Sequence, residues 1–245
     1  MEEQIILIQC WYRHRLKIRK IKKIQSWFRG TIIRRKKLPL ILYRIQNYLR
    51  KINIELSLVS EDGRINSIID EYVILEKLKE RYLDIIEIAP KRQWYDILVY
   101  DKLYGWLPVN IKTSTLTSSD NSGNLAMCLY AYTDMNMELR NSYNNGYASE
   151  LLIEKLRNKE YNLTKRDYYF LVVNKNNTND VIINSIKGLS NLTSNINNLP
   201  FQICWNNNRE YDYKKIEISV NMFIECIKKP KPSWKELFLN NIRDL

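Results

Sequence analysis

The sequence contains a single histidine, His14, and only four cysteines, which are far apart at positions 10, 128, 204 and 226. One histidine excludes a two-histidine metal site, and because His14 lies among arginines in the basic N-terminal segment, we do not expect Ser-His-Asp or Cys-His chemistry. The absence of a CxxC pair argues against a zinc site or a disulfide framework. We therefore expect small buried thiols in a reducing, intracellular compartment.

Long apolar runs are also missing. No segment reaches eighteen uncharged apolar residues, and the acidic start of the chain is followed by an apolar run too short for a secretory signal. An apolar fraction of 45% in 245 residues is nevertheless enough for a folded core. We therefore expect a soluble globular protein with no membrane segment.

Basic residues are concentrated at the N-terminus. Residues 1–51 contain fifteen Lys or Arg and two acidic residues, whereas residues 52–245 contain 24 basic and 25 acidic residues. The whole excess behind the net charge of +12 therefore lies in the first segment. This break in composition predicts a basic helical leader over residues 1–51 and a folded domain over residues 52–245.

The leader contains a repeated pattern, with IQCWYR, IQSWFR and IQNYLR in succession along a stretch of helical apolar spacing. The middle copy resembles the IQ motif, IQxxxRGxxxR, through five residues: Ile24, Gln25, Arg29, Gly30 and Arg34. In that family, calmodulin-like proteins bind the motif helix, so the resemblance implies such a partner. The alternative is a basic helix that lies on DNA phosphates or packs on its own domain.

Residues 60–90 predict a long helix, with Ser60 as its N-cap and Pro90 as its end, because apolar residues recur at helical spacing. Glu71 and Glu76 fall on the two flanks of its apolar stripe.

The next segment predicts a β-hairpin. YDILVY and WLPVNIKTST are rich in β-forming residues, and DKLYG between them carries turn residues. Asp96 begins the first strand, and Asn110 and Lys112 share one face of the second. Magnesium-assisted phosphodiester cleavage needs this set, because oxygen ligands hold the metal while a lysine orients or deprotonates the attacking water.

A helix with a Glu, then an Asp, then (D/E)xK in a strand is the layout of the PD-(D/E)XK nucleases, the fold of many type II restriction endonucleases, and this segment resembles it. Asp96 matches the Asp, Lys112 matches the Lys, and Asn110 stands where the family has an acid. The resemblance implies catalysis by Lys112 and a Mg²⁺ site, with Mn²⁺ as a substitute, formed by Asp96, Asn110, the carbonyl of Ile111 and a helix carboxylate. We assign that carboxylate to Glu71, with Glu76 as the alternative.

The same resemblance implies a fold, a substrate and an assembly. It implies an α/β, restriction-endonuclease-like domain with a mixed central sheet flanked by helices, acting on double-stranded DNA as a homodimer. It also places DNA contacts in the polar loop after the hairpin, at Ser114, Thr115, Thr117, Asp120 and Asn121. Residues 123–136 are expected to form the helix that follows.

The remainder of the chain is compatible with this domain. Residues 167–192 predict two strands joined by an Asn-rich turn, with residues 168–173 buried on both faces. Residues 198–215 mix aromatic, amide and basic side chains and are a candidate for base contacts. The final segment predicts a helix with four packing residues, Trp234, Leu237, Phe238 and Ile242.

Two rival functions stay open on the sequence. Asn110 in place of an acid favours a catalytically inactive relative that serves as a DNA-binding or structural module. The middle repeat of the leader favours a protein that is regulated or anchored by calmodulin.

Overall fold

The computed structural model of the chain describes residues 14–23, 38–57, 63–135, 137–141, 143–162, 166–195, 200–229 and 242. Its contacts divide the chain into two compact units, Met1–Lys37 and Leu38–Leu245. In the first unit, residues 14–23 are helical, as the apolar spacing of the leader predicts. The IQ-like residues lie outside the described part of the chain: Ile24, Gln25, Arg29, Gly30 and Arg34.

The second unit is built on a mixed sheet of five strands in the order β1-β2-β3-β5-β6. The strands are β1 Ile86–Ile88, β2 Ile97–Asp101, β3 Gly105–Ser114, β5 Tyr169–Asn174 and β6 Asn177–Ser185. Neighbouring strands are antiparallel except β3 and β5, which are parallel. A short second sheet pairs β4 Ser119–Asp120 with β7 Ile203–Cys204. The prediction of an α/β domain with a mixed central sheet is confirmed.

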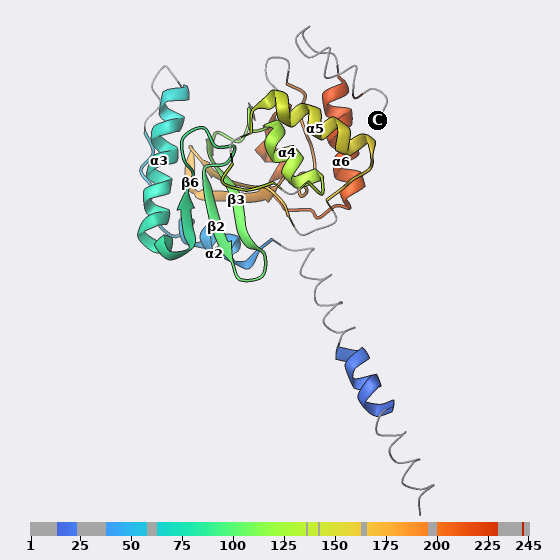
Figure 1. Cartoon of the computed structure of the whole chain (residues 1–245). Coiled ribbons are helices and arrows are strands. Elements are labelled where there is room, and N and C mark those ends of the chain that lie inside the picture. The colour runs from blue at the N-terminus through green and yellow to red at the C-terminus, as the bar shows by residue number, and fades with distance from the viewer. Residues whose placement is uncertain are drawn as a thin grey trace, which may run out of the picture. The chain divides into compact units, whose positions relative to one another are not determined.

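Helices cover both faces of this sheet (Figure 1). One face packs against α2 Leu40–Leu49 and α3 Gly63–Tyr82. The other packs against α4 Leu125–Tyr132, α5 Asn145–Arg157 and α6 Ile216–Lys228. Short 3₁₀ turns, η1 Leu83–Ile85 and η2 Trp205–Asn208, follow α3 and β7. Among the described residues, no helix is long and apolar enough to cross a bilayer.

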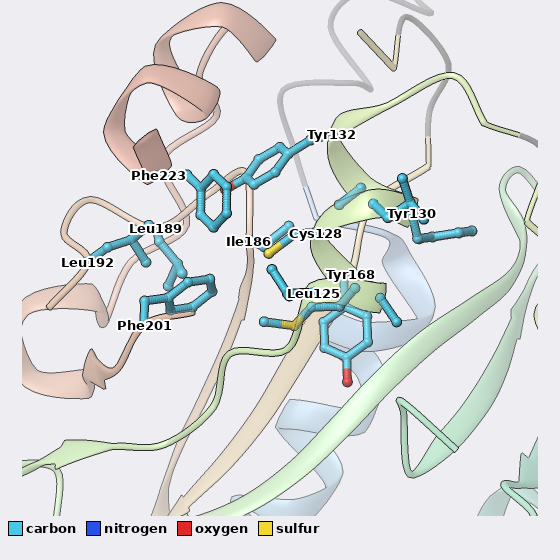
Figure 2. Close-up of a cluster of buried hydrophobic side chains, with 14 of the residues drawn as sticks. Leu125, Cys128, Tyr130, Tyr132, Tyr168, Ile186, Leu189, Leu192, Phe201 and Phe223 are labelled. Atoms are coloured by element: carbon cyan, nitrogen blue, oxygen red, sulfur yellow. The ribbon is translucent and has the colours of Figure 1, made fainter. Parts of the chain in front are cut away.

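Alternation along the strands divides the core into two clusters. Ile111 and Leu171 face α2 and α3, whereas Phe170 and Val172 face the other three helices. The second cluster is rich in aromatic rings, and Figure 2 shows Tyr132 of α4 beside Phe223 of α6 and Tyr168 beside Leu125 of α4. Because both faces are covered, β5 is almost entirely apolar, as predicted for residues 168–173.

One predicted element ends in a different place from that expected. The long helix stops at Tyr82 rather than continuing to Pro90, and Ile86–Ile88 forms strand β1. Two isoleucines in that short segment favour a strand, and antiparallel pairing with β2 satisfies its backbone groups. The predicted hairpin, the helix after it and the later strand pair are confirmed as β2–β3, α4 and β5–β6.

Helix α2 belongs with the sheet although it lies before the expected domain boundary at residue 51. Its buried residues Leu42, Ile45 and Leu49 join the core cluster, and Gln46 Nε2 donates to Val181 O of β6 at 2.8 Å. Its apolar face is therefore used for packing, and its positive charge does not separate it from the neutral domain.

Helices α5 and α6 were not predicted from the sequence. Both pack with the aromatic core cluster, although α5 has little net hydrophobicity. The predicted terminal helix lies outside the described residues except Ile242, which is buried.

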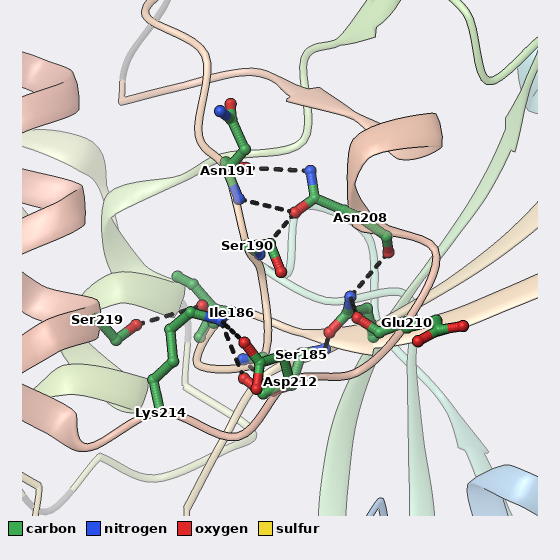
Figure 3. A network of polar contacts seen from close by, with 11 residues as sticks. Ser185, Ile186, Ser190, Asn191, Asn208, Glu210, Asp212, Lys214 and Ser219 are labelled. Atoms are coloured by element: carbon green, nitrogen blue, oxygen red, sulfur yellow. Dashed lines mark hydrogen bonds and ion pairs between the residues drawn. The ribbon is translucent and has the colours of Figure 1, made fainter.

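The amide-rich segment after β7 is used for internal hydrogen bonds. Asn208 is 1% exposed, and its Oδ1 accepts from the N–H groups of Ser190 and Asn191 at 2.8 and 3.0 Å (Figure 3). Its Nδ2 donates to the carbonyls of Asn191 and Cys204. Asn184 donates to the carbonyl of Asn208 at 2.8 Å. Because the side chain of Asn208 is buried and its hydrogen bonds are made inside the domain, it does not serve as the base contact considered for this segment.

We predict that Phe170→Ala lowers the free energy of unfolding by about 3–5 kcal/mol, because it opens a cavity at the centre of the fold. Phe170 is fully buried, and its ring centroid lies 5.3 Å from that of Trp205. Urea denaturation followed by circular dichroism measures the loss. Leu103→Ala in the β2–β3 turn, where Leu103 is 47% exposed, is the control, with an expected change within about 0.5 kcal/mol. Equal losses would contradict this account of the core.

Candidate functional site

The candidate site lies just before the start of β2, where β3 continues beyond its pairing with that strand. β2 pairs with β3 only as far as Ile97 and Val109, whereas β3 stays paired with β5 up to Ser114. One edge of β3 is therefore open beyond this point. The side chain of Asp96 covers the first open N–H, because its Oδ2 accepts from Ile111 N at 2.7 Å. The carboxylate is fixed at the point where the two strands separate.

The backbone of Ile111 presents a second polar group at this edge. In a strand, the N–H and C=O of one residue point to the same side. The carbonyl of Ile111 therefore projects from the same open edge as the N–H that binds Asp96. This is the carbonyl that the sequence analysis proposes as an additional ligand.

Glu71 reaches the site from α3. Its Oε1 accepts from Lys112 Nζ of β3 at 3.0 Å, and the two side chains are 22% and 25% exposed. The contact joins two residues that are 41 positions apart in the sequence. Helix α3 and the central strand therefore bring the predicted carboxylate and the predicted lysine together.

Both carboxylates of the site are harder to ionise than usual. Burial raises the pKa of Asp96, although the charge of Lys112 and the N–H of Ile111 oppose it. Burial also raises the pKa of Glu71 against the attraction of Lys112, and the negative charge of Asp96 adds to the rise. Burial is therefore the main reason why ionisation of these two carboxylates is disfavoured.

Lys112 is held as an ammonium. Burial alone would lower its pKa, but the attraction of Glu71 and Asp96 outweighs that effect, and Asp120 contributes in the same direction. The pKa of Lys112 is therefore raised. At neutral pH this side chain donates hydrogen bonds and carries positive charge, and it has no lone pair with which to accept a proton.

Asn110 lies beside these groups but outside the cleft. Its side chain hydrogen-bonds the hydroxyl of Tyr168. That hydroxyl donates its own proton to Trp94 O at 2.7 Å, so the amide NH₂ of Asn110 is the donor. Its Oδ1 is buried without a hydrogen-bond partner among the described residues. An orphaned buried acceptor of this kind is rare, and it lies one residue from the Asp96–Ile111 contact.

A cleft of about 310 Å³ opens onto the two acids. It lies between α3, the segment that joins β1 to β2, and the open edge of β3. Glu71, Asp96 and Ile111 belong to its wall, whereas Asn110 and Lys112 do not. The wall also contains Ile68, Tyr72 and Leu75 from α3, and Lys91, Arg92 and Gln93 from the turn after β1.

A second acid–lysine pair lies beside the first and was not predicted from the sequence. Asp70 is fully buried, and its Oδ1 accepts from both the N–H and the hydroxyl of Ser57 at 2.7 Å. Its Oδ2 lies 3.5 Å from Nζ of Lys175, in the turn between β5 and β6. Successive acids on α3 thus contact lysines from different parts of the sheet. The only sequence signal was an acid on the apolar side of a helix.

Glu76, the alternative to Glu71, is placed differently. Its Oε1 contacts Lys79 Nζ at 2.6 Å on the same helix, and its side chain is 41% exposed. Hydrogen bonding to Lys79 lowers its pKa, which is typical of a solvated surface pair. Glu71 is therefore the helix carboxylate that reaches the site.

The residues predicted to contact DNA have mixed environments. Thr115, Thr117 and Asn121 are exposed. Ser114 is 3% exposed, and its hydroxyl accepts from Leu116 N at 3.0 Å. Asp120 is half-buried; burial raises its pKa, whereas the positive charges of Lys112 and Lys175 oppose the rise. Asp120 is therefore an electrostatic neighbour of the site.

The donor atoms at the site are all oxygens, which is the ligand type that Mg²⁺ and Mn²⁺ prefer. Two carboxylates and a backbone carbonyl face the cleft edge, and the amide oxygen of Asn110 lacks a partner. Among the described residues, no three His, Cys, Asp or Glu side chains lie close enough to hold a metal ion together. The residues therefore fit a divalent cation through oxygen ligands, with two carboxylates rather than three.

Comparison with known proteins adds no family assignment. No family model matches the sequence, and no curated protein matches it significantly.

We predict that the adjacent acids of α3 differ in their contribution to stability. Asp70→Asn removes a buried charge that holds Ser57 and Lys175, so we expect the free energy of unfolding to fall by about 3 kcal/mol or more. Glu71→Gln is expected to change it by less than about 1 kcal/mol, because the pKa of Glu71 is raised and a neutral side chain is tolerated there. Urea denaturation of both variants tests the difference. A larger loss of unfolding free energy in Glu71→Gln than in Asp70→Asn would contradict the assignment of Asp70 as the structural acid of α3.

Proposed function

We propose that this protein is a metal-dependent DNA endonuclease that hydrolyses phosphodiester bonds at the Glu71–Asp96–Lys112 site. The observation that carries the proposal is the meeting of a helix carboxylate, a carboxylate at the start of β2 and a lysine of β3 beside one cleft. The three residues were selected from the sequence for this chemistry. Their order along the chain does not by itself require these three side chains to meet, and their convergence at one cleft therefore supports the proposal.

Glu71 and Asp96 would hold the cation, with the carbonyl of Ile111 as an additional ligand. When bound, Mg²⁺ polarises a phosphate oxygen and lowers the pKa of a bound water. The raised pKa values of the two carboxylates are compatible with this assignment, because burial disfavours their ionised form and a bound cation would offset that cost. The N–H of Ile111 keeps the Asp96 carboxylate oriented toward the open edge.

Lys112 acts in this proposal as a donor and a positive charge. Because its pKa is raised, it orients the attacking water by donating to it and stabilises the charge that builds up on the phosphate. The other role considered for this lysine, deprotonation of the water, needs a neutral amine and has less support. Glu71 holds the ammonium in place through the contact at 3.0 Å.

DNA is the proposed substrate because of the charge distribution. Residues 1–51 contain fifteen basic and two acidic residues, and this leader supplies phosphate contacts that the nearly neutral domain lacks. The resemblance to type II restriction endonucleases extends the proposal to double-stranded DNA, to a homodimer and to contacts by the exposed loop around Thr115 and Thr117.

We predict that Lys112→Ala lowers the rate of DNA cleavage at least about 100-fold, because it removes the charge that stabilises the reacting phosphate. The measurement is Mg²⁺-dependent cleavage of supercoiled plasmid, and Asp96→Asn is expected to have an effect of similar size. Lys79→Ala is the matched control, since Lys79 pairs with Glu76 on the same helix that carries Glu71. No cutting by the wild-type protein with either Mg²⁺ or Mn²⁺ would contradict the enzymatic proposal.

A second candidate function is a catalytically inactive nuclease-like module that binds DNA. It is favoured by Asn110, whose amide replaces an acid and whose oxygen does not reach the cleft wall. The variant Asn110→Asp separates the two candidates. DNA cleavage by Asn110→Asp, with none by the wild-type protein, would support the inactive module.

We predict that cation binding weakens as the pH falls, and that the loss begins at a higher pH than for ordinary carboxylates. Protons and the cation compete for Glu71 and Asp96, and burial raises the pKa of both acids. Calorimetric titration with Mn²⁺ between about pH 5 and pH 8 measures the dependence. Binding that is constant over this range would place the cation elsewhere. Glu76→Gln is the control, because Glu76 lies outside the cleft.

A further inference from the structure

The wall of the cleft includes residues that the proposed cation site does not use. Its rim is the turn after β1, where Lys91 and Arg92 are both exposed and line the opening. Neither side chain forms an ion pair with any residue in the described parts of the chain. Two uncompensated cations therefore face the entrance of a cleft whose floor carries two carboxylates.

The turn that presents these cations is firmly held. Gln93 N donates to Pro90 O at 3.3 Å, and Gln93 Nε2 donates to Arg140 O at 2.8 Å. Trp94 Nε1 donates to Asn141 O at 3.3 Å. Arg92 has a φ of 69°, a left-handed conformation that usually belongs to glycine. Such a conformation is often found at ligand sites.

The opposite wall offers an exposed aromatic ring and an exposed aliphatic side chain. Tyr72 is 59% exposed and Ile68 is 70% exposed, one turn apart on α3. Both line the cleft, together with the partly buried Leu75. An aromatic ring beside an apolar side chain at the edge of a cleft is the surface on which an unpaired base stacks. The arrangement is thus cationic on one rim and flat and apolar on the other.

The size of the cleft limits what can enter. Its volume of about 310 Å³ lies at the lower end of the roughly 300–1,000 Å³ typical of ligand pockets. It has room for a group of the size of one nucleotide, and a base pair that remains stacked in a duplex does not fit into it. A base that enters has to leave its stack first.

We infer that this cleft binds one unpaired nucleotide, with its base against Tyr72 and Ile68 and its adjoining phosphate against Lys91 and Arg92. The inference rests on the proposed function and narrows its substrate class to DNA that carries an unpaired nucleotide beside the bond to be cut. A continuous duplex has to open locally before its backbone reaches Glu71 and Asp96.

The test compares binding of the full chain to one fluorescein-labelled DNA oligonucleotide as a single strand and as its full duplex. Fluorescence anisotropy is measured in EDTA, so that no cleavage occurs. The basic leader contributes to binding of both forms, and the ratio of the two affinities therefore reports on the cleft. We expect the wild-type protein to bind the single strand about 10-fold more tightly.

Variants of the ring identify the stacking surface. Tyr72→Ala is expected to lower the single-strand preference about 5-fold or more, whereas Tyr72→Phe, which keeps the ring, preserves it. Tyr147→Ala is the matched control, because Tyr147 is a tyrosine of α5 that is 48% exposed and lies outside the cleft. Its preference is expected to equal that of the wild type.

Variants of the turn identify the phosphate contact. The double variant Lys91→Ala with Arg92→Ala is expected to weaken single-strand binding about 10-fold and to reduce its salt dependence. Two controls, Lys102→Ala and Lys159→Ala, remove exposed lysines elsewhere in the domain. The double variant should lose more affinity for the single strand than the two controls combined.

Equal affinity of the wild type for the two forms, or a preference that Tyr72→Ala leaves unchanged, would overturn the inference, and plasmid cleavage would still support the nuclease. A preference that depends on Tyr72 in a protein that cuts no DNA would refute the nuclease and retain the nucleotide-binding cleft. The binding experiment tests the nucleotide cleft and the plasmid experiment tests the nuclease, so either proposal can fail without the other.

Discussion

The hydrogen bond from Ile111 N–H to the Asp96 carboxylate is the interaction on which the candidate site depends. It lies just before the first residue of β2, where β3 continues beyond that strand, and it supplies the partner that the N–H of Ile111 would otherwise lack. A carboxylate that satisfies this N–H cannot turn into solvent without leaving a backbone group unpaired. The same bond therefore orients the acid at the edge of the cleft.

Charge compensation connects this point to the rest of the domain. Lys112 lies between Glu71 and Asp96, and Lys175 approaches Asp70 one residue earlier on α3. The Asp70–Lys175 and Glu71–Lys112 pairs have different roles. Asp70 is fully buried and tied to Ser57, which makes it a structural anchor for the segment before α3. Glu71 lines the cleft and has a raised pKa, which suits a group that meets a cation or a substrate.

Much of the sheet could be predicted from local patterns. The β2–β3 hairpin, α4 and the β5–β6 pair each have a turn or cap and a periodicity of their own, and the structure confirms them. Strand β1 was missed because its apolar spacing continues that of the preceding helix, and α5 because its sequence is polar. Helix α6 was missed although its apolar residues do follow helical spacing. α2 was assigned to the leader by its charge, although its apolar face packs on β2 and β6. Tertiary packing decided each of these cases.

The sequence by itself determined the types of chemistry available: one histidine, dispersed cysteines, an Asp before a β-strand and a lysine on the next strand. It also determined that Asn110 and Lys112 share a face, because side chains alternate along a strand. Only the tertiary structure decided that Glu71 rather than Glu76 meets Lys112, that Asn110 keeps its oxygen away from the cleft wall, and that Lys91, Arg92 and Tyr72 surround the opening. The reason is that these relations depend on how α3 and the β1–β2 segment are oriented against β3, and contacts across such distances in sequence leave no local pattern.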